Sequence, residues 1–130
     1  MPFHPATLSE GHISFSVGDG ATEIAPGIYY IDVYMPYDCT IVDWTILAPK
    51  EEGSIVFDIW VSHEDTYPPT VEHSITASDK PTLSAARSAS GASLTEWDTA
   101  LHHGDTIRIN VDSVEDLTLA TLVLSVQRHT

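Results

Sequence analysis

Apolar and polar residues alternate along much of the chain, a period of two that is typical of β-strands with one buried and one exposed face. The clearest example is residues 54–62. One face would carry Ile55, Phe57, Ile59 and Val61, and the other Asp58 and Trp60. Five further segments share the pattern: residues 12–17, 30–35, 40–47, 106–112 and 117–128. The alternation predicts a protein built mainly of β-strands.

Turn-forming residues separate these segments. Gly18-Asp19-Gly20 follows the first one, and its glycines suit a turn that needs positive φ. Pro36-Tyr37-Asp38 ends the second. Residues 40–47 and 54–62 are joined by a short loop that contains Gly53, and we therefore predict that they form a β-hairpin.

The periodicity is lost in residues 63–92, which are rich in Pro, Ser, Thr and Ala and are predicted to be mostly a connection. A single helical turn is expected around residues 71–75, because Thr70 can cap it. Residues 93–101 leave two alternatives open. Ser93 and Glu96 match a helical capping box, whereas the shortness of the segment and its β-rich neighbours favour a strand.

Seven or eight short strands without a long helical pattern indicate an all-β protein, an antiparallel β-sandwich or jelly roll of about eight strands. We expect one domain, residues 12–130, preceded by a short N-terminal arm, residues 1–11. Within the arm, Phe3 and Leu8 are candidate anchors on a neighbouring subunit in an assembly. The alternative is that the arm is a frayed terminus.

The net charge of the chain argues against some classes of binding partner. The 130 residues include 19 acidic and 5 basic ones, a formal net charge of −14. Binding to nucleic acid or to anionic membranes relies on clustered Lys and Arg, so neither partner is expected. The acidity is expected to keep the protein soluble, and it would also suit a basic partner surface.

Cys39 is the single cysteine, which excludes a disulfide within the chain. The start of the sequence lacks the basic and apolar regions of a signal peptide, and no apolar run is long enough to cross a bilayer. We expect a soluble protein made in a cytoplasm.

Motifs for catalysis or metal binding are weak. The histidine-containing candidates are His63-Glu64-Asp65, His73 and His102-His103, and none has the spacing of a zinc motif, so they are expected to be solvated loop residues. There is no nucleophile elbow and no phosphate-binding glycine loop. The many carboxylates give no reason to choose a hydrolytic pair. We predict no enzymatic activity, no catalytic residue, no metal and no cofactor.

Aromatic residues are the strongest candidates for binding. Tyr30 and Tyr34 would share one strand face with Asp32 between them, and Trp60 would lie beside Asp58. An aromatic ring next to a carboxylate can stack on a sugar while the acid bonds its hydroxyls. The other interpretation is that these rings pack in a subunit interface.

Several segments resemble a small β-module of tailed-bacteriophage virion proteins over roughly residues 12–128. The matching stretches are Cys39-Thr40-Ile41 with Trp44, Gly53 to Trp60, Tyr67-Pro68-Pro69-Thr70-Val71, Ser74-Ile75-Thr76, Lys80-Pro81-Thr82-Leu83-Ser84, Ser93-Leu94-Thr95 with Trp97, Gly104-Asp105 and Asn110-Val111-Asp112-Ser113. The chain departs from the pattern in its higher acidity and in His63-Glu64.

The resemblance implies a jelly-roll domain without a catalytic motif, located in the virion. Two roles are open: a head decoration (cement) protein bound to the major capsid protein or another virion protein, and a tail-associated module that binds a host surface glycan. We favour decoration by a homotrimer, because no coiled coil, fibrous repeat or second domain is present to join the chain to a tail.

Overall fold

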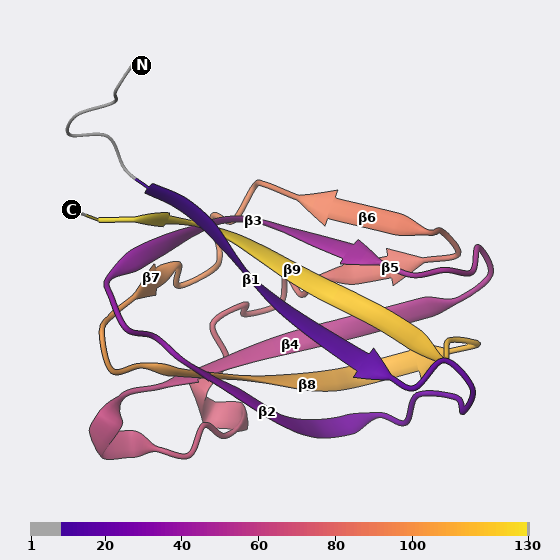
Figure 1. The fold of residues 1–130 in the computed structure, drawn as a ribbon, viewed down its shortest axis with the longest axis horizontal. Helices are drawn as coiled ribbons and strands as arrows, with labels where there is room; N and C mark the ends of the chain where they lie inside the picture. Colours follow the sequence, from indigo (N-terminus) through magenta and orange to yellow (C-terminus); the bar gives the residue numbers. More distant parts are fainter. Residues whose placement is uncertain (1–8, 130) are drawn as a thin grey trace, which may run out of the picture.

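The structure is a computed structural model that describes residues 9–129, and β-strands dominate it (Figure 1). In chain order the strands are β1 (Ser9–Gly18), β2 (Gly27–Tyr34), β3 (Cys39–Leu47), β4 (Ser54–Ser62), β5 (Thr82–Ser84), β6 (Ser88–Gly91), β7 (Ala100–Leu101), β8 (Thr106–Glu115) and β9 (Leu119–Arg128). Two single-turn 3-10 helices, η1 (Glu64–Thr66) and η2 (Val71–His73), lie between β4 and β5. Neither of these helical turns, nor any other helix in residues 9–129, has the length and apolarity that a membrane span requires.

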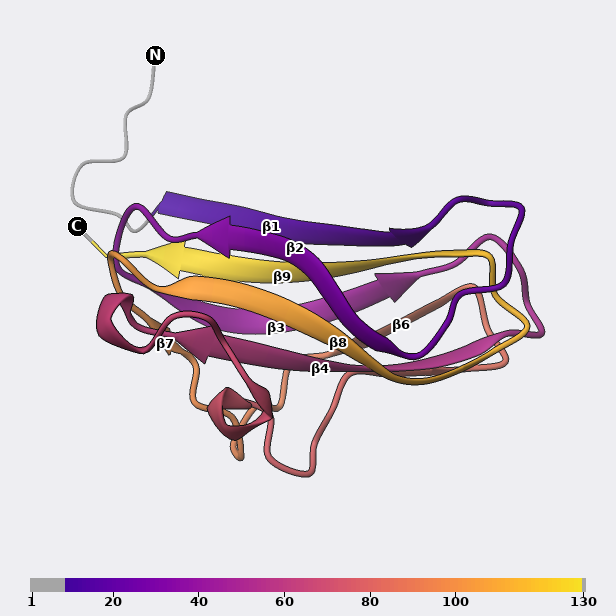
Figure 2. The same cartoon turned by 90° about the horizontal axis from the view of Figure 1, so that it is seen from below.

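The strands form two antiparallel sheets packed face to face (Figures 1 and 2). Sheet A has the order β1-β9-β3-β6, with β7 pairing a second part of β3, and sheet B has the order β2-β8-β4-β5. If the two-residue β7 is set aside, the other eight strands pass from sheet to sheet in the order of a jelly roll. The predicted fold class is confirmed, with nine strands in place of about eight.

The predicted hairpin between residues 40–47 and 54–62 is wrong. These residues form β3 and β4, which lie in different sheets: β3 pairs with β9, and β4 pairs with β8. The loop that joins them therefore crosses from one sheet to the other. Period-two alternation shows which side chains face the core but not which strand lies alongside, and both strands here face the same core from opposite sides.

The segment predicted to be mostly a connection also contains strands. β5 and β6 lie within residues 63–92, and each extends one edge of a sheet. The expected helical turn is present as η2. In residues 93–101 the structure has no helix, and the strand alternative holds only for the two residues of β7.

The chain enters and leaves the sandwich at the same end, because Ser9 of β1 pairs with Arg128 of β9. β1 already includes residues 9–11, which the sequence placed in the arm. Residues 1–8, with the candidate anchors Phe3 and Leu8, lie outside the described residues.

The core lies between the two sheets and is apolar. Phe15 from sheet A and Phe57 from sheet B are fully buried, as are Ile46 and Ile59. The single cysteine, Cys39, is buried with them, and burial raises the pKa of its thiol. At the end of β1, Gly18 has φ +93° and its Cα lies so close to the Thr118 carbonyl that a Cβ would clash. This confirms the predicted glycine turn.

Candidate functional site

Exposed aromatic rings gather on the outer face of sheet B. Tyr30 and Tyr34 point outward from β2 and are 75% and 54% exposed, as the alternation predicts. Tyr67, which follows η1, is 56% exposed and donates a hydrogen bond from its hydroxyl to Asp32 Oδ2 (2.9 Å). We call the surface formed by Tyr30, Tyr34 and Tyr67 the tyrosine face.

An ion pair lies at the centre of the tyrosine face. Arg108, on the neighbouring strand β8, donates from Nε to Asp32 Oδ1 and from Nη2 to Asp32 Oδ2, each at 2.8 Å. This two-pronged geometry holds both side chains in one orientation. These hydrogen bonds from Arg108 lower the pKa of Asp32 below its ordinary 3.8, although partial burial acts in the opposite direction. Asp32 is therefore an ionised structural carboxylate.

The ion pair also positions a ring. The Arg108 guanidinium carbon lies 4.8 Å from the centre of the Tyr30 ring, a cation–π contact that leaves the other side of the ring facing solvent. Tyr34 meets the ring of His103 edge to face, with 6.1 Å between ring centres. The hydrogen bond to Asp32 raises the pKa of Tyr67 above 10.0 and keeps its hydroxyl protonated. All three tyrosines are thus held by neighbours.

Asp58 and Trp60 do not form the exposed site that the sequence suggested. They point to the outer side of sheet B but are 2% and 4% exposed, because residues 74–80 lie against β4. Asp58 accepts hydrogen bonds from the Trp60 indole (3.0 Å), the Ser74 hydroxyl (2.7 Å), the Thr76 hydroxyl (2.8 Å) and the backbone N–H of Ile59 (2.8 Å). Asp58 and Trp60 therefore hold residues 74–80 against β4, and they are too buried to form a ligand-binding surface.

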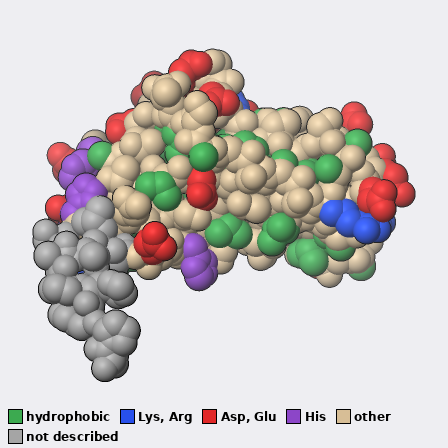
Figure 3. All heavy atoms as spheres, turned by 90° about the horizontal axis from the view of Figure 1, so that it is seen from above, with side chains coloured by type: hydrophobic (Ala, Val, Ile, Leu, Met, Phe, Trp, Pro, Cys, Tyr) green, Lys and Arg blue, Asp and Glu red, His purple; other side chains and the backbone are tan. Residues whose placement is uncertain are grey.

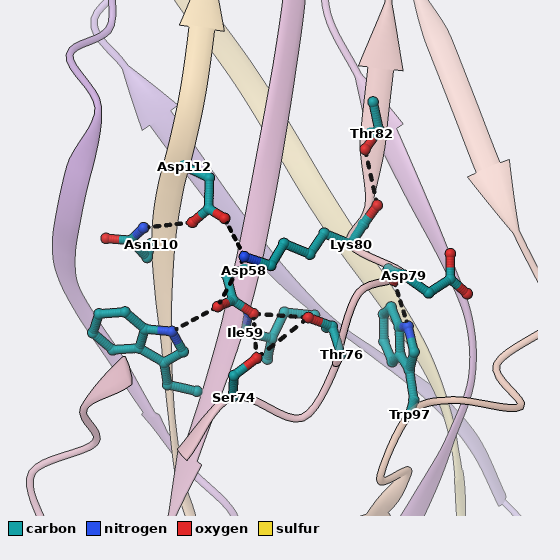
Figure 4. Close-up of polar contacts among 11 residues, drawn as sticks. Asp58, Ile59, Ser74, Thr76, Asp79, Lys80, Thr82, Trp97, Asn110 and Asp112 are labelled. Carbon is teal, nitrogen blue, oxygen red and sulfur yellow. Dashed lines mark hydrogen bonds and ion pairs between the residues drawn. The ribbon is translucent and has the colours of Figure 1, made fainter. Parts of the chain in front are cut away.

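Lys80 extends this network (Figure 4). Its ammonium group lies 3.7 Å from Asp58 Oδ2 and bonds Asp112, which in turn accepts from the Asn110 amide (2.7 Å). These contacts tie the connection between β4 and β5 to the outer side of sheet B. Burial of a carboxylate is stable here because several donors replace its water.

Histidines cluster at one end of the sandwich. His63 Nδ1 lies 2.6 Å from Asp105 Oδ1, and the rings of His63 and His102 are 6.2 Å apart. Asp105 is 2% exposed and also accepts from the His102 backbone N–H (2.9 Å). Within residues 9–129, no group of three or more His, Cys, Asp or Glu side chains is arranged to hold a metal ion. His73 instead bonds Thr70 at the start of η2.

The contact with Asp105 gives a prediction about pH. The Asp105 hydrogen bond raises the pKa of His63 above 6.5, so the folded state favours the protonated ring. This stabilisation is complete below about pH 6.5 and is lost as pH rises through the folded pKa. The contribution is small, about 0–1 kcal/mol, because the His63 side chain is 64% exposed. Thermal unfolding of His63→Gln should lose this pH-dependent part, whereas the exposed-residue control His12→Gln should keep it.

Sequence reasoning placed Tyr30, Asp32 and Tyr34 on one face but missed Arg108 and Tyr67. The signal for Arg108 was present, since it alternates with buried Ile107 and Ile109 on β8. Tyr67 belongs to the aperiodic connection, and only the three-dimensional fold brings it to Asp32.

No protein-family model matches the sequence, and no curated protein matches it as a relative. Similar solved structures include the CBM32 of AlyQ in complex with 4,5-unsaturated mannuronic acid, with 13% identity, 90% of this chain and 78% of that chain covered, and a TM-score of 0.45. A chain of the cyanophage Pam1 capsid asymmetric unit has 12% identity, coverages of 99% and 91%, and a TM-score of 0.45. A carbohydrate-binding module of glycoside hydrolase family 9 (Cel9A) from Ruminococcus flavefaciens FD-1 has 14% identity, coverages of 89% and 98%, and a TM-score of 0.43. Likenesses this remote do not extend to ligands or activities.

Proposed function

We propose that this protein is a non-enzymatic structural component of a tailed-bacteriophage virion, a decoration protein that binds the head surface as a homotrimer. The phage assignment is supported by the sequence segments that resemble the virion β-module. The observation that carries the assembly role is an uncharged surface on sheet A.

The outward positions in one half of sheet A contain no charged residue. The pairing of β1, β9, β3 and β6 places eight such residues in two adjacent rows: Ser16, Thr121, Leu47 and Ser88, then Ser14, Val123, Thr45 and Ser90. We call this surface the neutral face. The next outward positions along the same strands include the acidic residues Asp43 and Glu10. They lie toward the end of the sandwich where β1 begins.

The neutral face is the surface where two copies of a chain of charge −14 repel each other least. Copies that meet through acidic surfaces repel one another, so the neutral face is where a second copy approaches at the least electrostatic cost. A cyclic trimer uses two different parts of the face on each copy, one toward each neighbour. In Figure 3, acidic side chains lie at both ends of the molecule, on the part that projects at the top and at two places nearer the middle, and most of the visible histidines lie at one end.

The placement of the carboxylates favours a structural role over a catalytic one. Asp58 is surrounded by donors, and Asp105 accepts from His63 and His102. Asp32 is paired with Arg108 and its pKa is lowered, whereas a general acid in hydrolysis needs a raised pKa. The proposal is therefore of a protein that binds and does not catalyse.

A single charge should disrupt the trimer. We expect the unmodified chain to sediment as a trimer in analytical ultracentrifugation and Thr45→Glu to sediment as a folded monomer, because each new carboxylate would be pressed without a partner against the neighbouring copy, which is itself acidic. Thr95→Glu, which adds the same charge to an exposed loop position, is the matched control and should remain trimeric. A trimeric Thr45→Glu variant would show that the neutral face is not the contact.

Head attachment is tested separately by co-sedimentation with heads and with tails isolated from virions that lack the protein. Decoration predicts saturable binding to heads. The alternative role, a tail-associated receptor-binding module, predicts binding to tails alone, and that result would overturn the proposal.

A further inference from the structure

We infer that the tyrosine face is a binding site for a neutral oligosaccharide. This inference goes beyond attachment to the head and concerns the opposite sheet from the neutral face. It rests on the exposure of the rings, on their fixed positions and on the charge of the site.

Exposed large hydrophobic side chains are concentrated on and around the tyrosine face. Among the large hydrophobic side chains exposed in residues 9–129, most belong to β2 or to the segment after η1; they are Ile28, Tyr30, Ile31, Tyr34, Tyr67 and Val71. Exposed tyrosines in a group are costly to leave in water and are typical of recognition surfaces. Their rings offer flat apolar surface for the C–H side of a sugar, and their hydroxyls both donate and accept hydrogen bonds.

The site is already ordered without a ligand. Tyr30 lies against Arg108, Tyr67 is bonded to Asp32, and Tyr34 contacts His103. Arg108 is in turn held by both oxygens of Asp32, and a further contact joins its Nη1 to the Pro69 carbonyl (3.5 Å). A ligand that stacks on these rings therefore loses little free energy to ordering the protein.

Charge selects a neutral ligand. The one cation at the centre, Arg108, is paired with Asp32 and is 7% exposed, so an anionic sugar gains no free positive charge there. The rest of the chain, at −14, repels polyanions. A cationic ligand is disfavoured for a related reason, since the Asp32 carboxylate already accepts three hydrogen bonds.

The arrangement of the rings suits an oligosaccharide. Tyr30 and Tyr34 lie on the same strand, and Tyr67 is beside them through its hydrogen bond to Asp32. The register of β2 shifts between Tyr29 and Val33, which shortens the strand there, so the two rings are less than about 13 Å apart along it. A short chain of sugars can lie along the strand and stack on more than one ring.

The test is binding of the purified full chain to a printed array of neutral and anionic glycans, followed by titration calorimetry with the strongest ligand. We expect binding to neutral oligosaccharides, affinity at least about fivefold weaker for Tyr30→Ala and for Tyr34→Ala, and near-normal affinity for Tyr30→Phe, which keeps the ring. Leu119→Ala removes an exposed apolar side chain from sheet A, outside the eight residues of the neutral face, and should bind normally.

Three outcomes would overturn the inference: no binding on the array, binding confined to anionic glycans, or equal affinity of Tyr30→Ala, Tyr34→Ala and the unmodified chain. Equal affinity of the three proteins would mean that the glycan binds to a surface other than the tyrosine face. Thermal midpoints of the variants guard against misfolding, because both rings are exposed and their removal should change stability little. None of these results depends on where the protein sits on a virion, so this inference and head decoration can fail independently.

Discussion

Replacement of Asp58 by Ala is expected to lower the free energy of unfolding by about 3–5 kcal/mol. The substitution leaves the Trp60 indole and the hydroxyls of Ser74 and Thr76 without their acceptor, and it removes one of the two carboxylates near Lys80. These donors are shielded from water by the connection between β4 and β5. For a chain of this size the thermal midpoint should fall by about 10–20 °C.

Two variants make this measurement specific. Asp98→Ala removes an exposed carboxylate and should leave the midpoint within a few degrees of the unmodified chain. Asp58→Asn retains the shape and one acceptor oxygen, so its loss should be intermediate. If Asp58→Ala and Asp98→Ala have the same thermal midpoint, then the hydrogen bonds in Figure 4 do not stabilise the packing of the β4–β5 connection on sheet B.

Replacement of Arg108 by Met is expected to cost about 2–3 kcal/mol, because the charged hydrogen bonds to Asp32 are lost while Asp32 stays partly buried. Met keeps most of the apolar length of the side chain. The same variant should weaken oligosaccharide binding more than its stability loss alone implies, since Tyr30 and Tyr67 lose the pair that positions them.

The matched control is Arg87→Met. Arg87 also pairs with a carboxylate, Glu51, at 3.0 Å, but both side chains are about two-thirds exposed. An exposed pair of this kind contributes about 0–1 kcal/mol. Chemical denaturation should therefore separate the two arginines clearly, and equal losses would contradict the idea that Arg108 is the structural centre of the tyrosine face.

The sequence predicted those parts of the fold that depend on local alternation. Phe57 and Ile59 face the core, Asp58 and Trp60 face away from it, and the six strongly periodic segments are all strands. Pairing was harder to predict. In a jelly roll, strands that follow each other in the chain mostly belong to different sheets, so the short loop at Gly53 gave a hairpin that the structure lacks.

The candidate site was predictable to the extent that a single strand defines it. Tyr30, Asp32 and Tyr34 are exposed, as the sequence predicted, although an irregularity between Tyr29 and Val33 interrupts the alternation and exposes Ile31 as well. Trp60 shares that outward direction but is covered by residues that carry no periodic signal. Whether an outward residue is exposed depends on what the rest of the chain lays over it, and alternation contains no information about that.

The central claim, that the protein decorates the phage head, is tested most directly by a cryo-electron-microscopic reconstruction of virions that carry it. We expect three copies of a two-sheet sandwich around local threefold axes of the capsid, with the neutral faces in contact between copies and the tyrosine faces outward. Density for the protein on the tail alone, with a bare head surface, would contradict it.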